Sequence, residues 1–130
     1  VEPEAYLTCW VALTDATEAN GCPRVVPGLH RGGTLAHVAT ELGFVCFDDP
    51  PAQPLAAPVR AGGIVVFSSL TPHATGPNET REERRAYIVQ FAPDGAIALR
   101  RGPDGAITRT PCDAPERQYP VLAGGEPVAL

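Results

Sequence analysis

The chain has 130 residues, the length of one domain or part of one, and 44% of them are hydrophobic and 19% charged. This composition is typical of a soluble globular chain and excludes a disordered one. The formal net charge of −5 and the pI near 5.1 argue against a nucleic-acid-binding surface, because such surfaces are basic.

The 15 prolines and 13 glycines stand between short apolar runs, which favours short strands joined by turns over long helices. The first predicted strand, Tyr6–Leu13, is apolar on both faces and is therefore expected in the centre of a sheet, with Trp10 on one face. Asn20-Gly21 is a strong turn signal, and a second short strand is predicted within residues 22–28.

Residues 31–61 are predicted to form a loop-rich insertion that walls a site, with a short helix near Leu35–Leu42. Ile64–Ser68 is predicted to be a buried strand, and Arg85–Phe91 an alternating one. The sequence Pro-Asp-Gly-Ala-Ile, at 93–97 and again at 103–107, predicts consecutive hairpins. The elements together indicate an all-β sandwich or jelly roll.

His73 and Arg84 flank a turn-rich loop between two of these strands. A hairpin centred near Asn78 and Glu79 would set residue 73 opposite residue 84, with their Cα atoms about 5 Å apart. Imidazole is the commonest protein ligand for metals, and the planar guanidinium binds a carboxylate through two hydrogen bonds. On spacing alone, the alternative is a solvated loop histidine beside the charged segment 79–85.

Residues 9–30, 62–67 and 73–86 resemble the phytanoyl-CoA dioxygenase family of non-haem iron(II), 2-oxoglutarate-dependent oxygenases. Two blocks carry the resemblance: Asn-Gly-Cys at 20–22 with Pro-Gly-x-His at 27–30, and His-x-Thr-Gly-x-Asn at 73–78 with Arg84. The resemblance implies a double-stranded β-helix (a cupin-like jelly roll). It also implies iron(II), the co-substrate 2-oxoglutarate and O2 as reaction partners, and hydroxylation of a small organic substrate.

Four residues of this chain match functional positions of the family. By the resemblance, His73 is the distal iron ligand and Arg84 pairs with the far carboxylate of 2-oxoglutarate. Thr75 matches a hydroxyl that hydrogen-bonds the co-substrate, and Trp10 matches a wall of its pocket. A purely structural role for Trp10 in the core is the alternative, and the two roles are compatible.

Three further predictions concern residues around this expected site. Arg85 should point to solvent, because adjacent strand residues face opposite sides. His30 is expected to be a hydrogen-bonded structural residue near the site, and His37 to lie in a loop that lines the substrate entrance.

No histidine of this chain is followed two positions later by an acidic residue, so the His-x-Asp pair that completes the family's iron site is absent from it. We expect that pair just upstream of Val1, which makes residues 1–130 a single domain and the C-terminal portion of a jelly roll lacking its N-terminal part, with hairpins and a tail at 93–130. Alone, the chain should then be inactive, because one histidine cannot replace a three-ligand face. The alternative is a non-catalytic jelly-roll binding module that has lost its metal site.

The four cysteines include no Cys-x-x-Cys pair, which favours reduced thiols and a cytoplasmic protein. No apolar stretch approaches the roughly 20 residues that span a bilayer. We therefore expect a small-molecule substrate and neither a nucleic-acid nor a membrane partner. A halogenase-like variant of the site and the oligomeric state stay open.

Overall fold

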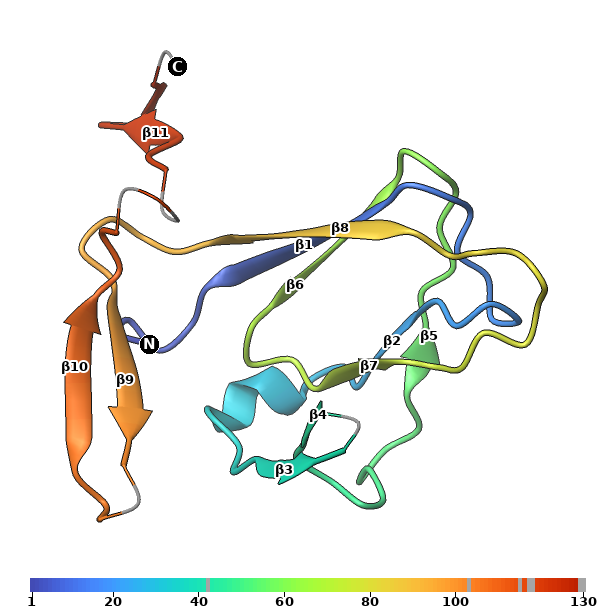
Figure 1. Ribbon diagram of the computed structural model, residues 1–130, viewed down its shortest axis with the longest axis horizontal. Coiled ribbons are helices and arrows are strands. Elements are labelled where there is room, and N and C mark those ends of the chain that lie inside the picture. The colour runs from blue at the N-terminus through green and yellow to red at the C-terminus, as the bar shows by residue number, and fades with distance from the viewer. Residues whose placement is uncertain (42, 103, 115, 117–118, 129–130) are drawn as a thin grey trace. The chain divides into compact units, whose positions relative to one another are not determined.

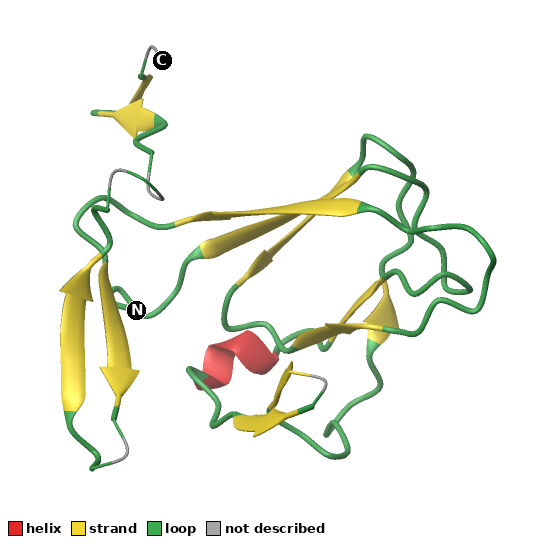
Figure 2. Cartoon of the chain, in the orientation of Figure 1, coloured by secondary structure: helices red, strands yellow, loops and turns green. Residues whose placement is uncertain are grey.

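The computed structural model describes residues 1–41, 43–102, 104–114, 116 and 119–128. The chain divides into two compact units, one formed by Tyr6–Phe91 and the other by Val1–Ala5 with Ala92–Leu130. Within the described residues the only helix is a single 3-10 turn, η1 (Leu29–Gly32), and all other regular elements are strands (Figure 2). The all-β prediction is confirmed. The residues that the structure describes include no helix long and apolar enough to cross a membrane.

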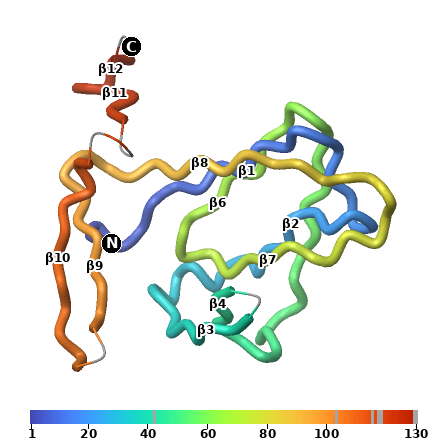
Figure 3. Tube along the Cα trace, viewed as in Figure 1, coloured from blue at the N-terminus to red at the C-terminus, as the bar shows by residue number. Residues whose placement is uncertain are grey.

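The larger unit contains two antiparallel sheets of three strands and one separate hairpin. The first sheet has the order β6 (Ile64–Ser68), β1 (Leu7–Ala12), β8 (Ala86–Phe91), and the second β5 (Leu55–Ala56), β2 (Pro23–Val25), β7 (His73–Thr75). Along the chain, β1, β6 and β8 alternate with the strands of the second sheet, as the traces show (Figures 1 and 3). Winding back and forth between two sheets is the arrangement of a jelly roll.

Trp10 lies at the centre of the first sheet, opposite Val65 on one neighbouring strand and Ile88 on the other. Its side chain is 4% exposed and belongs to a buried cluster with Ala12, Ala16 and Cys22. The prediction of a central strand carrying Trp10 is therefore confirmed. The cluster also receives side chains from both edge strands of the sheet, so it holds the inner face of the unit together.

The prediction of a buried strand at Ile64–Ser68 is right for one face only. Val65 and Phe67 are half-buried and pack against the Trp10 cluster, whereas Ile64 and Val66 are more than half exposed. Successive strand residues point to opposite sides of a sheet. An apolar run therefore indicates a strand but does not establish that both of its faces are covered.

The short helix predicted near Leu35–Leu42 is wrong. The structure has a hairpin there, in which β3 (Val38–Thr40) pairs antiparallel with β4 (Gly43–Val45). Leu42 itself lies outside the described residues. The β-branched Val38 and Thr40 favour an extended backbone, and Gly43 has a φ of 114°, which other residues rarely adopt. These local preferences favour strands over the predicted helix.

The smaller unit confirms one of the two predicted Asp-Gly hairpins. β9 (Ile97–Arg101) pairs with β10 (Ile107–Pro111) across the second Asp-Gly, although Pro103 lies outside the described residues. The first hairpin is wrong: the chain does turn at 93–96, but β8 pairs with β1, and Ile97 instead bridges to Glu2. A third hairpin joins β11 (Leu122–Ala123) to β12 (Glu126–Pro127).

An exposed ion pair joins the two chain segments that form this smaller unit. Arg109 donates from Nη1 to Oε1 of Glu2 over 2.9 Å. That hydrogen bond lowers the pKa of the Glu2 carboxyl below its ordinary value. The pair therefore adds to the Glu2–Ile97 bridge at the same place.

Candidate active site

His73 is the first residue of β7 and lies opposite Val25 of β2. Its Nδ1 is 2.8 Å from the main-chain oxygen of Thr71. A carbonyl oxygen only accepts hydrogen bonds, so Nδ1 carries the proton and Nε2 is left with a lone pair in the neutral ring. The Phe67 ring packs against the imidazole at a centroid distance of 4.5 Å. Histidines that bind metals are commonly oriented by such a hydrogen bond from the other ring nitrogen.

Arg84 stands just before β8 and is fixed from two directions. Its Nε donates to the main-chain oxygen of Asn20 over 3.2 Å, and its Cζ lies 5.5 Å from the centroid of the Trp10 ring, a cation–π contact. The side chain is half-buried, and its two terminal nitrogens have no hydrogen-bond or ion-pair partner among the described residues. A guanidinium held in this way offers its outer edge to a carboxylate.

Strand alternation predicts that Arg84 and Arg85 face opposite sides, and the family resemblance selects Arg84 as the inward one; the structure agrees with both. Arg85 is exposed, and its Nε donates to Oε2 of Glu83 over 2.8 Å. Arg84 instead contacts Trp10, on the face to which Ala86 and Ile88 also belong. The two adjacent guanidinium groups therefore have different surroundings, which makes Arg85 a matched control for Arg84.

The hairpin expected to set His73 opposite Arg84 is wrong. β7 pairs with β2 and β8 pairs with β1, so the two residues belong to segments of different sheets. The loop between them crosses from one sheet to the other, as consecutive strands of a jelly roll do. The first sheet nevertheless contacts both residues from its inner face, His73 through Phe67 and Arg84 through Trp10.

Gly21 brings the Asn20 turn against the loop that carries Arg84. Its φ is 80°, and a Cβ there would fall on the Gly76 carbonyl oxygen and 2.8 Å from that of Pro77. The absence of a side chain at Gly21 thus permits the close approach that places the Asn20 oxygen beside Arg84.

We expect Gly21→Ala to destabilise the protein more than Gly62→Ala. Gly62 has nearly the same φ, 83°, but a Cβ there meets nothing within 4 Å. Both variants pay the cost of a left-handed alanine, about 1 kcal/mol, and Gly21→Ala adds about 1–3 kcal/mol for the clash with two backbone oxygens. Urea unfolding measures the difference. Equal losses in the two variants would show that the contact between Gly21 and Gly76 is not required.

Thr75 lies two positions after His73 on β7, opposite Pro23. It is exposed, and its hydroxyl makes no hydrogen bond within the part of the chain that the structure describes. His30 lies in η1 and is also exposed, and its ring makes no hydrogen bond to a described residue. The expectation of a hydrogen-bonded structural role for His30 is therefore wrong, because η1 is a short exposed turn.

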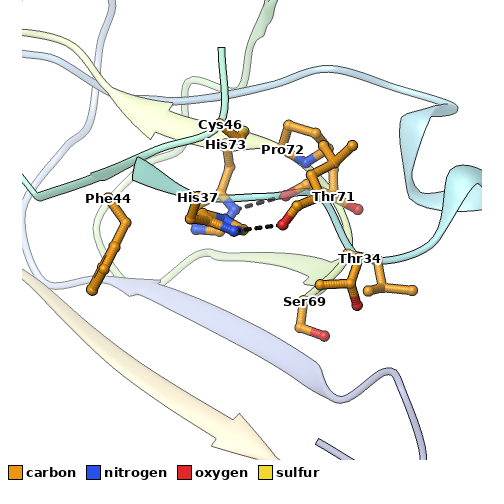
Figure 4. Close-up of a pocket in the computed structure, with 10 residues that line it drawn as sticks. Thr34, His37, Phe44, Cys46, Ser69, Thr71, Pro72 and His73 are labelled. Atoms are coloured by element: carbon orange, nitrogen blue, oxygen red, sulfur yellow. Dashed lines mark hydrogen bonds between the residues drawn. The ribbon is translucent and has the colours of Figure 1, made fainter. Parts of the chain in front are cut away.

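A cavity of about 230 Å³ opens beside His73, between residues 34–46 and residues 69–73 (Figure 4). His37 lines it, and its Nδ1 lies 2.8 Å from the main-chain oxygen of Leu35. Phe44 and Cys46 line it as well, and neither was singled out from the sequence. Their positions follow from the hairpin β3–β4. The sequence predicts a helix in this segment and therefore does not place these two side chains at the cavity.

The described residues contain no group of three or more histidine, cysteine, aspartate or glutamate side chains arranged to hold a metal ion. His73 fits one ligand position because its Nε2 is available. The described part of this chain therefore fits part of an iron site and not a whole one.

The fold and these side chains define a jelly-roll protein with a candidate metal ligand and an anchored cation, both in contact with the inner face of the first sheet. The sequence model of the family described as "Phytanoyl-CoA dioxygenase (PhyH)" matches residues 1–86. The chain belongs to the phytanoyl-CoA dioxygenase family. The match includes the strands β1 to β7 and ends at the first residue of β8.

Curated relatives match the same region. The chain is 35% identical over 89 residues to the methylphosphonate hydroxylase of Gimesia maris. This alignment covers 66% of this chain and 33% of the relative. It is 33% identical over 87 residues to Dioxygenase FUM3 of Gibberella moniliformis. That alignment covers 67% of this chain and 25% of FUM3. The chain thus spans a quarter to a third of the length of these relatives.

Solved structures give the same fold. EvdO2 of Micromonospora carbonacea var. aurantiaca, complexed with 2-oxoglutarate, matches with a TM-score of 0.63 and 31% identity over 88% of this chain and 45% of that chain. The epimerase SnoN, in complex with Fe3+, alpha ketoglutarate and nogalamycin RO, matches with a TM-score of 0.60 over 97% of this chain and 48% of that chain. At 23% identity, SnoN supports the jelly-roll fold alone.

Proposed function

We propose that the protein containing this chain is an iron(II)- and 2-oxoglutarate-dependent dioxygenase that hydroxylates a small organic substrate. The observation that carries the proposal is the half-buried Arg84 guanidinium, fixed on Trp10 and Asn20 with its outer edge open. Family membership supports it, as does the 2-oxoglutarate complex of EvdO2, the solved relative with 31% identity.

Each of four residues has a distinct role in this proposal. His73 binds iron(II) through Nε2, in the orientation that the Thr71 carbonyl and Phe67 impose. Arg84 binds the far carboxylate of 2-oxoglutarate, Thr75 donates a hydrogen bond to it, and Trp10 walls the co-substrate pocket. The hydrophobic Trp10 face excludes water from the Arg84 ion pair and thereby strengthens it.

Bound iron(II) with 2-oxoglutarate supplies the activation of O2 and the oxidation of a C–H bond, with release of carbon dioxide and succinate. The chain itself contributes binding and orientation. Arg84 fixes one end of the co-substrate, and the hydrogen bond from Nδ1 keeps the Nε2 lone pair of His73 directed at one point. The other ligands of the proposed 2-His-1-carboxylate face are residues outside this chain.

We expect the 130-residue chain alone to release no succinate when mixed with iron(II) and 2-oxoglutarate in air. The described residues supply one candidate ligand of the three that the metal site requires. Enzymatic detection of succinate, with the intact protein as positive control, measures this. Release above the background of iron and 2-oxoglutarate without protein would contradict the assignment of ligands outside the chain.

A non-catalytic jelly-roll binding module is the second candidate, and it is favoured by the lack of a His-x-Asp sequence in this chain. The coding sequence upstream of Val1 distinguishes the two. A His-x-Asp shortly before Val1 supports the oxygenase, and its absence supports the module.

A further inference from the structure

The cavity beside His73 has an uncharged lining. Of the ten described residues that line it, none is an arginine, lysine, aspartate or glutamate. Burying a charged group without a partner is costly, and proteins that bind phosphate or carboxylate groups provide arginine or lysine for them. Apart from the proposed metal at His73, the wall that this chain contributes therefore offers no charged partner to an anionic group, and it is suited to a neutral one.

His37 gives this wall a directional hydrogen-bond acceptor. Its Nδ1 faces the Leu35 carbonyl oxygen at 2.8 Å and must donate to it. In the neutral ring, Nε2 then holds a lone pair that can accept a hydrogen bond but cannot donate one. Both imidazoles of the cavity are thus oriented by a main-chain carbonyl, His37 by Leu35 and His73 by Thr71 (Figure 4).

Phe44 supplies an aromatic surface at the same place. Its side chain is 79% exposed although it lines the cavity, and its ring meets that of His37 edge to face at 6.5 Å. A large aromatic residue exposed at the rim of a cavity is a typical contact for an apolar ligand. His37, just before β3, and Phe44 of β4 therefore present an acceptor nitrogen and an apolar ring side by side.

We propose that this cavity receives the primary substrate as a neutral, hydroxyl-bearing group. The hydroxyl donates to Nε2 of His37, and the apolar part of the same group packs on Phe44. The proposal rests on the proposed function, which places the reacting iron at His73. It makes His37 a specificity-determining residue that selects an alcohol over an ether or a phosphate ester.

The size of the cavity limits what it holds. Pockets for whole drug-sized ligands measure about 300–1,000 Å³. At about 230 Å³, the part of the cavity that the described residues enclose has room for one ring-sized portion of a molecule. Small probes that differ at a single functional group are therefore suitable tests.

The test compares cyclohexanol, methoxycyclohexane and cyclohexyl phosphate by ligand-observed NMR. The intact protein is loaded with zinc(II), which is redox-inert, so that binding is read without turnover. The variants are His37→Phe, which keeps a ring but removes the acceptor, and Val38→Ala as the control. Val38 is the adjacent hairpin residue, 67% exposed and not part of the cavity lining.

In the unmodified protein and in Val38→Ala, we expect cyclohexanol to bind roughly three- to tenfold more tightly than methoxycyclohexane, the value of one hydrogen bond. His37→Phe should abolish that ratio. It should leave the affinity for cyclohexyl phosphate unchanged, because a phosphate group can bind the zinc ion directly and needs no acceptor. Three results would overturn the proposal: no binding of cyclohexanol, an unchanged ratio in His37→Phe, or His37-dependent binding of the phosphate that exceeds that of the alcohol.

Failure of this proposal is distinguishable from failure of the proposed function. Arg84→Ala should weaken 2-oxoglutarate binding to the zinc-loaded protein while leaving the cyclohexanol ratio unchanged. If Arg84→Ala leaves 2-oxoglutarate binding intact, the proposed function fails, and the alcohol-to-ether ratio still reports on the cavity.

Discussion

His73→Ala abolishes detectable succinate release by the intact protein supplied with iron(II), 2-oxoglutarate and substrate. The imidazole is the ligand that we assign to this chain, because its Nε2 is free to bind a metal, and its loss leaves two of the three proposed ligand positions filled. His73 is exposed, so its removal creates no cavity in the core and the variant should fold.

Two measurements separate loss of metal from loss of fold in this variant. Iron bound per protein, determined after anaerobic loading and desalting, should fall well below that of the unmodified protein. The midpoint of urea unfolding of the metal-free protein should stay close to the unmodified value. Full turnover in His73→Ala would remove His73 from the metal site.

Arg84→Ala raises the dissociation constant for 2-oxoglutarate by roughly a hundredfold. Removing a guanidinium that pairs with a carboxylate in a partly desolvated site costs about 2–4 kcal/mol, because the carboxylate is left without its partner. The loss should appear mainly as a higher KM for 2-oxoglutarate in the succinate assay. Activity should return in part at saturating co-substrate.

Arg85→Ala is the matched control for this experiment. The two arginines are adjacent, but Arg85 pairs with Glu83 in solvent while Arg84 is held on Trp10. We expect Arg85→Ala to leave the KM for 2-oxoglutarate unchanged, because exposed ion pairs contribute little. Equal effects of the two substitutions would mean that the charge of the segment, and not the position of Arg84, attracts the co-substrate.

Strands with a consistent local pattern could be predicted from the sequence. The β-branched run at 64–68 and the alternating residues before Phe91 both correspond to strands, and the second pattern also assigned Arg84 and Arg85 to opposite surroundings. These predictions hold because side-chain direction alternates with each residue of a strand. The Asn20-Gly21 turn is likewise local, since Gly21 has the positive φ that glycine permits.

Pairing between strands could not be predicted in the same way. The loop after His73 looks like a hairpin connection, but β7 and β8 join different sheets, because the partner of each strand is distant in sequence. The contacts that orient the site are also non-local: Asn20 meets Arg84, and Phe67 meets His73. The family resemblance suggested the residues of the site, whereas the structure was needed to show how each is held.

We propose that His73 and Arg84 belong to one site for iron(II) and 2-oxoglutarate. The most direct test is anomalous diffraction at the iron absorption edge from crystals of the intact protein grown anaerobically with both. We predict an iron peak within bonding distance of His73 Nε2 and a 2-oxoglutarate carboxylate paired with the Arg84 guanidinium. Iron bound away from His73, or a co-substrate carboxylate held by other residues, would contradict it.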